Sequence, residues 1–365
     1  GWSGAPGDWS LLRGHIEANI CGGDAALFHW VMTWFAHPIQ HPGKKLGSAL
    51  ILRGPKGTGK TKPFQWYRQL FGIHGLVIAD SNRAVGRFNK HLSDLIFLQV
   101  EEGFWGGDAK AESVLKDLIT GDTIAIEAKC VDVVNVSSYV RIGMSANAKW
   151  VVPAGLDDER RFCVIDVEGE WVVDRRDGKR LKERVAFFKT IDDQMEAGGL
   201  AAMMHDLKQW KPANGDWNIL RNPPITDGLI RQGLSGLSPE ERFIVRLIAD
   251  GKISLPANDA PAPVEFEEHS KGFWYLNAPL LRDNYEAWMR GSPNGRYRAM
   301  NEEILRDLVK QWLGWEHTHI LRIGGENTRV YEVKAPAELR AALRDKGLGD
   351  HLTIAPEDDE EAEGD

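Results

Sequence analysis

The chain has 365 residues and a formal net charge of −8, and 42% of its residues are hydrophobic while 27% are charged. These values predict a soluble globular protein of about two domains. No apolar run reaches the ~18 residues that a membrane-spanning helix needs, and no signal peptide is visible, so a membrane protein is not expected. The three cysteines lack C-x-x-C spacing, which argues against a disulfide framework or a zinc site and favours a cytoplasmic location, bacterial or host.

The negative charge does not exclude a nucleic-acid partner, because it is concentrated at one end of the chain. Seven acidic residues lie between Glu357 and Asp365, and the rest of the chain is close to neutral. A near-neutral body can carry a local basic surface that binds phosphates. We expect residues 351–365 to be a disordered acidic tail.

The first half of the chain alternates between helical and strand patterns. Residues 1–20 are rich in Gly, Ser and Trp and predict a linker. Asp24 is placed to cap an amphipathic helix that we expect to end before Pro38. Short apolar runs then predict buried strands of a parallel sheet, and an alternating segment predicts a β-hairpin followed by another core strand. These segments are 47–54, 76–80, 95–100, 123–147 and 161–167.

This alternation predicts an α/β fold, with a P-loop NTPase (AAA+-like) core over residues 21–182. A helical segment is expected over 183–255, where Ser238 and Glu241 form a capping-box pattern. Residues 256–350 then predict two or three helices and a hairpin turning at Gly324-Gly325, the arrangement of a winged-helix-like C-terminal domain.

The sequence ILRGPKGTGKT, residues 51–61, matches the pattern G-x-x-x-x-G-K-[ST] after an apolar strand. Glycines let backbone N–H groups close around a β-phosphate, and the following helix directs its positive end to the same place. Lys60 is expected to reach the β- and γ-phosphates of ATP and Thr61 to bind Mg²⁺. The alternative is a glycine-rich turn with an incidental lysine. The expected ATP-binding residues are Gly54, Pro55, Lys56, Gly57, Thr58, Gly59, Lys60 and Thr61.

Two acids end the strand IFLQV, and an amide ends the strand IGMSA. Glu101 is expected to hold Mg²⁺ through water and Glu102 to orient and deprotonate the attacking water. Adjacent side chains on a strand point in opposite directions, so the two acids serve different roles. Asn147 is expected to contact the γ-phosphate. Two solvated acids and a turn-capping amide are the alternatives.

Arg160 and Arg161 lie at the start of the strand expected over 161–167. They form either a surface ion pair with Asp157 or Asp158, or an arginine finger that reaches the γ-phosphate of a neighbouring subunit. The second interpretation requires a ring of subunits.

This order of motifs resembles the superfamily-3 helicases, and more closely the primase-helicase proteins of phages, large DNA viruses and plasmids. The segment KDLITGDTIAIEAKCVDVVNVSSYVRIGMSAN looks like the part unique to that group, in which a β-hairpin carries a lysine into the pore of a ring. Lys129 falls at the matching place, and its alternative is a solvated hairpin residue. The resemblance covers most of residues 20–340, and Glu101 departs from it, because Asp is the common residue there.

The resemblance implies a hexamer that moves along single-stranded DNA with ATP, in the 3′→5′ direction, alongside a primase-polymerase domain. The chain begins at Gly1 without methionine, so we expect a piece of a longer protein. A backbone-phosphate contact by Lys129 would suit a motor that ignores sequence. Further cations in the C-terminal region either bind DNA or solvate helix faces; they are Arg282, Arg290, Arg296, Arg298, Arg306 and Lys310.

Three other functions remain open on the sequence. A ring ATPase could load or regulate a polymerase without unwinding DNA. A small-molecule or nucleoside kinase would need an arginine-rich lid and an acceptor pocket, which the sequence does not display. A nucleotide-gated scaffold without enzymatic activity is disfavoured by the intact Lys60, Thr61 and Glu102.

Overall fold

The computed structural model describes most of the chain, and the described residues form two compact units, Gly1–Gly236 and Leu237–Asp365. No helix within these residues is both long and apolar enough to cross a lipid bilayer. The expected acidic tail and Lys129 lie outside the described residues. Those described are 3–45, 47–79, 89–102, 109–128, 131–148, 150–155, 159–174, 176–255, 260–291 and 302–345.

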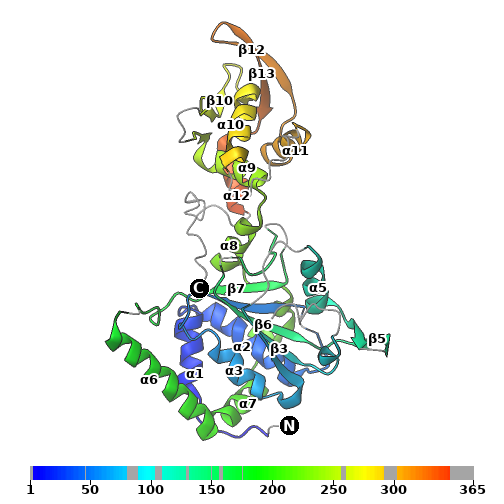
Figure 1. Ribbon diagram of the computed structural model, residues 1–365, viewed down its shortest axis with the longest axis vertical. Coiled ribbons are helices and arrows are strands. Elements are labelled where there is room, and N and C mark those ends of the chain that lie inside the picture. Colours follow the sequence, from blue (N-terminus) through cyan, green and yellow to red (C-terminus); the bar gives the residue numbers. More distant parts are fainter. Residues whose placement is uncertain are drawn as a thin grey trace. The chain divides into compact units, whose positions relative to one another are not determined.

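The first unit is built on a five-stranded sheet in the order β2-β3-β6-β1-β7 (Figure 1). Every neighbouring pair is parallel, so the predicted mixed α/β fold with a parallel sheet is confirmed. Short, β-branched, apolar runs form these strands because both faces of the sheet are covered. The strands are β1 (Ala49–Arg53), β2 (Gly75–Ile78), β3 (Phe97–Glu101), β6 (Arg141–Ala146) and β7 (Phe162–Asp166).

Helices cover both faces of this sheet, and alternate strand residues face two separate cores. Leu50 and Leu52 of β1 lie in one core, and Ala49 and Ile51 in the other, as the two-residue period of a strand requires. The first core is shared with α1 (Ser10–His15), η1 (Ile16–Ile20), α2 (Ala25–Gln40), α3 (Lys62–Gln69), α6 (Gly178–Gln194), η4 (Met195–Gly199) and α7 (Leu200–Gln209). The second is shared with α5 (Ala109–Thr120) and α8 (Asp227–Gly236).

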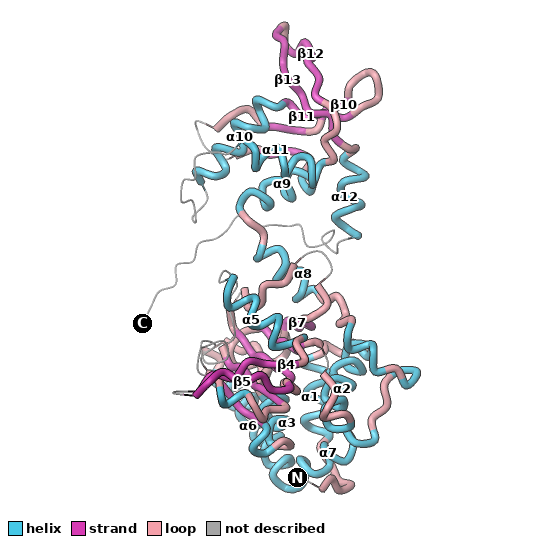
Figure 2. Tube along the Cα trace, turned by 90° about the vertical axis from the view of Figure 1, so that its right-hand side faces the viewer, coloured by secondary structure: helices cyan, strands magenta, loops and turns pink. Residues whose placement is uncertain are grey.

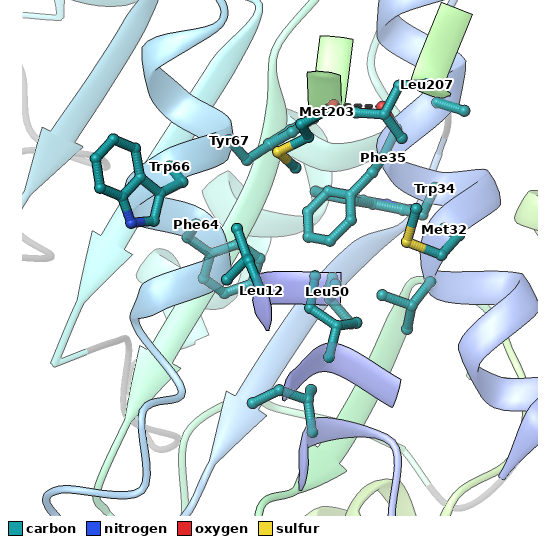
Figure 3. Packing of buried hydrophobic residues seen from close by; sticks show 14 of the residues in the cluster. Leu12, Met32, Trp34, Phe35, Leu50, Phe64, Trp66, Tyr67, Met203 and Leu207 are labelled. Carbon is teal, nitrogen blue, oxygen red and sulfur yellow. Dashed lines mark hydrogen bonds between the residues drawn. The ribbon is translucent and has the colours of Figure 1, made fainter. Parts of the chain in front are cut away.

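Aromatic rings fill the first core. Trp34 and Phe35 of α2 pack against Tyr67 of α3, whose hydroxyl donates to the Phe35 carbonyl oxygen at 2.8 Å (Figure 3). Burial raises the pKa of the Tyr67 hydroxyl well above its ordinary value. The bond to Phe35 satisfies a polar group that would otherwise destabilise this core.

The expected linker at 1–20 is wrong, because the segment is helical from Ser10 to Ile20 and completes the first core. Trp9, Leu12 and Ile16 are buried there. Their spacing places them on one face of a helix, but Gly and Ser between them mask this pattern.

Pro38 also differs from its expected role, since α2 continues past it to Gln40. It lies in the last turn, where the missing N–H removes a single backbone hydrogen bond and the helix ends soon after.

An antiparallel hairpin, β4 (Thr123–Ala128) and β5 (Val131–Ser137), interrupts the parallel sheet between α5 and β6, as predicted. Its turn contains Lys129 and is outside the described residues. The described part of this unit also contains short helical turns, which are η2 (Gly72–His74), η3 (Lys90–Leu92), η5 (Ala213–Gly215) and η6 (Trp217–Arg221).

The second unit combines helices with a four-stranded antiparallel sheet in the order β10-β11-β13-β12. β12 and β13 form the predicted hairpin, with positive φ at Gly324 and Gly325 in its turn (Figure 2). The elements are α9 (Pro239–Asp250), β8 (Lys252–Ile253), β9 (Val264–Glu265), β10 (Glu267–Glu268), β11 (Trp274–Asn277), α10 (Ala278–Gly291), α11 (Glu302–Leu313), β12 (Thr318–Ile323), β13 (Glu326–Val333) and α12 (Pro336–Asp345).

The boundary between the units divides the helical segment that we expected over 183–255. α6, α7 and α8 belong to the first unit, where α6 and α7 pack into the aromatic core. α9 belongs to the second unit; it begins with the capping box of Ser238 and Glu241 and ends at Gly251, as predicted. Local capping signals identify the helix but not the unit into which it packs.

Substitutions in α1 test whether residues 10–20 are part of the core. Leu12 is 0% exposed and its neighbour Leu11 is 38% exposed. We expect Leu12→Ala to lower the free energy of unfolding by about 2–5 kcal/mol, because it leaves a cavity in a packed core. Leu11→Ala should change it by less than about 0.5 kcal/mol. Urea unfolding measures both, and equal stability of the two variants would contradict the assigned packing.

Candidate functional site

The polar residues identified in the sequence meet at one edge of the sheet, where β1, β6 and β3 end together. Arg53 pairs with Ala146, and Glu101 pairs with Ser145. The next residue of each outer strand bonds to β6: the Gly54 N–H donates to Ala146 and the Glu102 N–H to Ser145. This register fixes the glycine-rich loop (residues 54–61) beside the acid pair.

The glycine-rich loop requires glycine at three positions. Gly54, Gly57 and Gly59 have φ of 154°, 90° and 80°, values that L side chains rarely adopt. A Cβ at Gly54 would lie 2.5 Å from the carbonyl oxygen of Val167. Glycine meets both requirements, the positive φ and the close approach to Val167, and so allows the tight turn between β1 and α3.

A chain of hydrogen bonds joins Lys60, Asn147 and Glu102. The Lys60 ammonium donates to Asn147 Oδ1 at 2.6 Å and to the Pro55 carbonyl oxygen at 2.9 Å. The Asn147 amide donates in turn to Glu102 Oε1 at 3.1 Å. Three residues that lie far apart in the sequence, each singled out by its pattern, therefore converge on one point.

The Lys60 ammonium is buried, and this burial lowers its pKa. The neighbouring Glu102 carboxylate raises the pKa in part, and the cation of Lys56 lowers it further. Lys60 thus lies in an environment that favours a close negative charge, because desolvation destabilises an isolated ammonium.

Glu102 is the last member of this chain and has a strained backbone, with φ of 56°. A non-glycine residue in this region is uncommon and concentrates at functional sites. The left-handed turn takes Glu102 out of the alternation of β3, so its side chain reaches Asn147 while Glu101 remains in the strand.

Thr61, Ser145 and Glu101 supply oxygen atoms beside this chain. The Thr61 hydroxyl donates to Ser145 Oγ at 3.2 Å, and Ser145 is the registered partner of Glu101. The Gln99 amide donates to Glu101 Oε1 at 2.8 Å and orients that carboxylate. Hydroxyl and carboxylate oxygens are ligands that Mg²⁺ prefers, so this donor set fits the expected ion; the sequence did not single out Ser145.

Arg160 and Arg161 do not join this cluster. They precede β7 at its amino end, where Phe162 pairs with Ala49, whereas the glycine-rich loop follows the carboxyl end of β1. Four residues of strand separate these edges, which is about 13 Å. Arg160 is exposed, and Arg161 lies 3.7 Å from Glu159. Asp157 and Asp158, the alternative partners, are outside the described residues.

Side chains of the N-terminal helices contact carbonyl oxygens of the glycine-rich loop. The sequence did not predict these contacts. The Asn19 amide donates to the Thr58 carbonyl oxygen at 2.9 Å, and His15 Nε2 lies 3.2 Å from the Gly59 carbonyl oxygen. Burial lowers the pKa of His15 to about 4, outweighing the bond to Gly59, which raises it. The neutral ring therefore donates from Nε2 at neutral pH.

A cavity of about 840 Å³ lies in the same unit, and two of its lining residues, Asn19 and Asp166, connect it to the loop and to the strand before it. Asn19 links it to Thr58. Asp166 links it to the start of the loop, because its carboxylate accepts from Arg53 at 2.5 Å and from Arg231 at 2.6 Å. The cavity is lined mainly by the η1–α2 turn and the segment leading into α8, and among its lining residues are Trp30, Asp216, Asn218, Asn222, Thr226 and Asp227.

Part of the first unit that contains these residues is similar to a known sequence family. Residues 52–161 match a family of unknown function, DUF5906. The matched span begins inside β1 and ends just before β7, so it contains the whole glycine-rich loop, the acid pair and Asn147. No curated protein sequence matches the chain.

Solved structures of the NrS-1 C-terminal region share the fold. An apo structure of that region has a TM-score of 0.61 at 17% sequence identity, covering 91% of this chain and 77% of that one. A second structure, described as the A form, gives 0.59 at 16% identity with the same coverage. At this identity the likeness concerns the arrangement of elements, and the site rests on the residues of this chain.

The pH dependence of stability tests the environment of His15. The pKa of His15 is about 4 in the folded chain and about 6.5 in the unfolded chain. Below pH ~6.5 the unfolded state therefore binds more protons, and the free energy of unfolding decreases as the pH is lowered. We expect the wild type to lose about 2 kcal/mol more than His15→Gln between pH 7 and pH 5. Gln retains a donor for the Gly59 carbonyl oxygen.

Urea unfolding at both pH values measures this difference. His91→Gln, on an exposed turn, is the matched control and should follow the wild type. Parallel pH curves for wild type and His15→Gln would show that His15 titrates normally in the folded chain.

Proposed function

We propose that this chain is the motor subunit of an ATP-dependent DNA helicase that acts in replication as a ring, most simply a hexamer, on single-stranded DNA. The observation that carries the proposal is the hydrogen-bonded chain from Lys60 through Asn147 to Glu102. It places a cation, an amide and a carboxylate beside a loop whose glycines suit phosphate binding.

The glycine-rich loop would hold the phosphates of ATP. Its backbone N–H groups and Lys60 would bind the β- and γ-phosphates, replacing the contacts of Lys60 with Pro55 and Asn147. The cavity lined by Asn19 and Asp166 is large enough for the nucleoside and would hold it, because its carboxylate and amide oxygens can accept hydrogen bonds from ribose hydroxyls and a base amino group.

Thr61, Ser145 and Glu101 would hold Mg²⁺, Glu101 through water. The ion would offset the charge of the phosphates when bound. Glu102 would orient the attacking water and accept its proton, and Asn147 would connect this base to the γ-phosphate. The strained backbone of Glu102 supports this role, because it directs the carboxylate toward Asn147.

A second subunit would complete the site. Arg160 and Arg161 lie at the opposite edge of the sheet from their own loop, so a finger from either one must act on a neighbour. Lys129, in the turn of the β4–β5 hairpin, would contact the DNA backbone in the pore, and the second unit would form a winged-helix-like domain. A primase-polymerase domain or protein is the expected partner, as the family resemblance implies.

Two substitutions separate nucleotide binding from hydrolysis. Glu102→Gln should lower the ATPase rate by about 10²–10⁴-fold, because it removes the general base, while ATP affinity changes little. Lys60→Ala should abolish ATP binding, because it removes the main cation of the loop. Equilibrium binding of a fluorescent ATP analogue and steady-state phosphate release measure the two effects.

Lys116→Ala is the matched control for these variants. Lys116 lies on α5 and pairs with Glu112 of the same helix, so binding and turnover should match the wild type. Full ATPase activity of Glu102→Gln would overturn the assignment of the base.

Arg160→Ala and Arg161→Ala test the shared site. At least one should lose ATP hydrolysis by about 10³-fold while keeping ATP binding, because the missing cation acts only in the transition state. Mixing the inactive Arg variant with inactive Glu102→Gln should restore part of the activity, since some interfaces then combine an intact finger with an intact base. No recovery on mixing, or full activity of both Arg variants, would refute the trans finger.

Native mass and a strand-displacement assay distinguish the remaining functions. A ring with DNA-stimulated ATPase activity that separates strands supports the helicase. The same ring without strand separation indicates a loading or regulatory ATPase, and an active monomer indicates a kinase-like enzyme.

A further inference from the structure

We infer that Arg184, on helix α6, binds the polyphosphate of a nucleotide held by the glycine-rich loop of the same protomer. The inference rests on the proposed ATP-binding function and adds a residue outside every motif of the sequence. It arises from the way in which α6 packs along the loop.

One face of α6 follows the glycine-rich loop over three successive turns. A Cβ at Gly57 would lie 2.4 Å from Arg184 Nη1, and a Cβ at Gly59 would lie 2.3 Å from the Phe188 ring. One turn further on, Asp192 pairs with Lys62 at 2.6 Å. Residues four apart share a helix face, so Arg184, Phe188 and Asp192 together align α6 with the loop and the start of α3.

Aromatic packing fixes the position of this helix. Phe187 stacks on Trp171 with ring centroids 4.5 Å apart. Phe188 meets the buried His15 edge to face at 5.4 Å, and His15 in turn contacts the Gly59 carbonyl oxygen. These contacts fix α6 one turn away from Arg184, so the helix presents this side chain at the loop.

Arg184 differs from the arginine one turn before it. Arg180 lies over the Trp171 ring and pairs with Glu170 and Glu183. Arg184 is half-buried, and among the described residues its side chain has neither a hydrogen bond nor an ion pair. Half-buried guanidinium groups ordinarily find a partner, because losing water without a replacement destabilises the charge.

The positive charges around Arg184 favour the binding of an anion. Lys56 precedes Gly57, and the positive charge of Lys56 already lowers the pKa of Lys60. The guanidinium of Arg184 beside Gly57 brings a further positive charge to the same loop. A polyphosphate would neutralise all three cations, and the planar guanidinium can bind two phosphate oxygens at once.

Binding of a nucleotide at Arg184 would also affect helix α6, because the charge of this side chain would attract the helix to the bound phosphates. The Lys62–Asp192 pair anchors the far end of the same face, so binding at Arg184 would fix α6 against the loop at both ends. Arg184 would act within one protomer, whereas Arg160 and Arg161 would act across an interface.

Nucleotide affinity of the Arg184→Ala variant tests the inference. We expect its dissociation constant for ATP to rise about 10- to 100-fold, because a charge-assisted phosphate contact is lost, with adenosine affinity unchanged. Arg184→Lys keeps the charge without the fork and should recover part of the affinity. Arg180→Ala is the matched control, and its ATP affinity should stay within about twofold of the wild type. Calorimetric titration at a protein concentration where native mass shows a monomer isolates the contact within one protomer.

The outcomes separate this inference from the proposed function. Wild-type ATP affinity in Arg184→Ala overturns the role of Arg184 and leaves the ATPase proposal standing. An equal loss of ATP and adenosine affinity also overturns it, because the side chain would then act on folding or on the base. Absence of ATP binding by the wild type refutes the proposed function itself.

Discussion

The candidate site depends on the register of three parallel strands. β6 lies between β1 and β3, and its pairing with each neighbour makes all three end at one edge. A shift of one residue in either pairing would reverse the face of every side chain in the displaced strand. Lys60, Asn147 and Glu102 could not then form one hydrogen-bonded chain, so the buried apolar faces of the strands also determine the geometry of the polar edge.

The glycine-rich loop is held by contacts from several segments of the first unit. Asn19 and His15 bind its carbonyl oxygens, and Arg184 and Phe188 pack where its glycines lack side chains. A loop supported in this way keeps its N–H groups arranged before a ligand arrives, which reduces the ordering that binding requires. Helices that precede the sheet strands in the chain and a helix that follows them thus contribute to the same site.

The sequence predicted the central elements well because their signals are local. Apolar runs gave the strands, Ser238 and Glu241 gave the start of α9, and two glycines gave the turn of β12–β13. It failed at residues 10–20, where Gly14 and several polar residues conceal a helix whose apolar positions are satisfied only by the distant core. It also misplaced the end of the first unit, since the packing partner of a helix does not appear in its caps.

By itself, the sequence determined which residues form the loop, the acid pair and the amide, because each follows its own strand in a recognisable pattern. Only the tertiary structure decided that Lys60, Asn147 and Glu102 are bonded in a row, that Ser145 lies beside Thr61, and that Arg160 and Arg161 lie at the opposite edge. The role of α6 was equally hidden, since Arg184 lies more than one hundred residues from Gly57 in the chain. Spacing along a chain fixes local conformation, whereas the contacts of a site follow from how strands pair and helices pack.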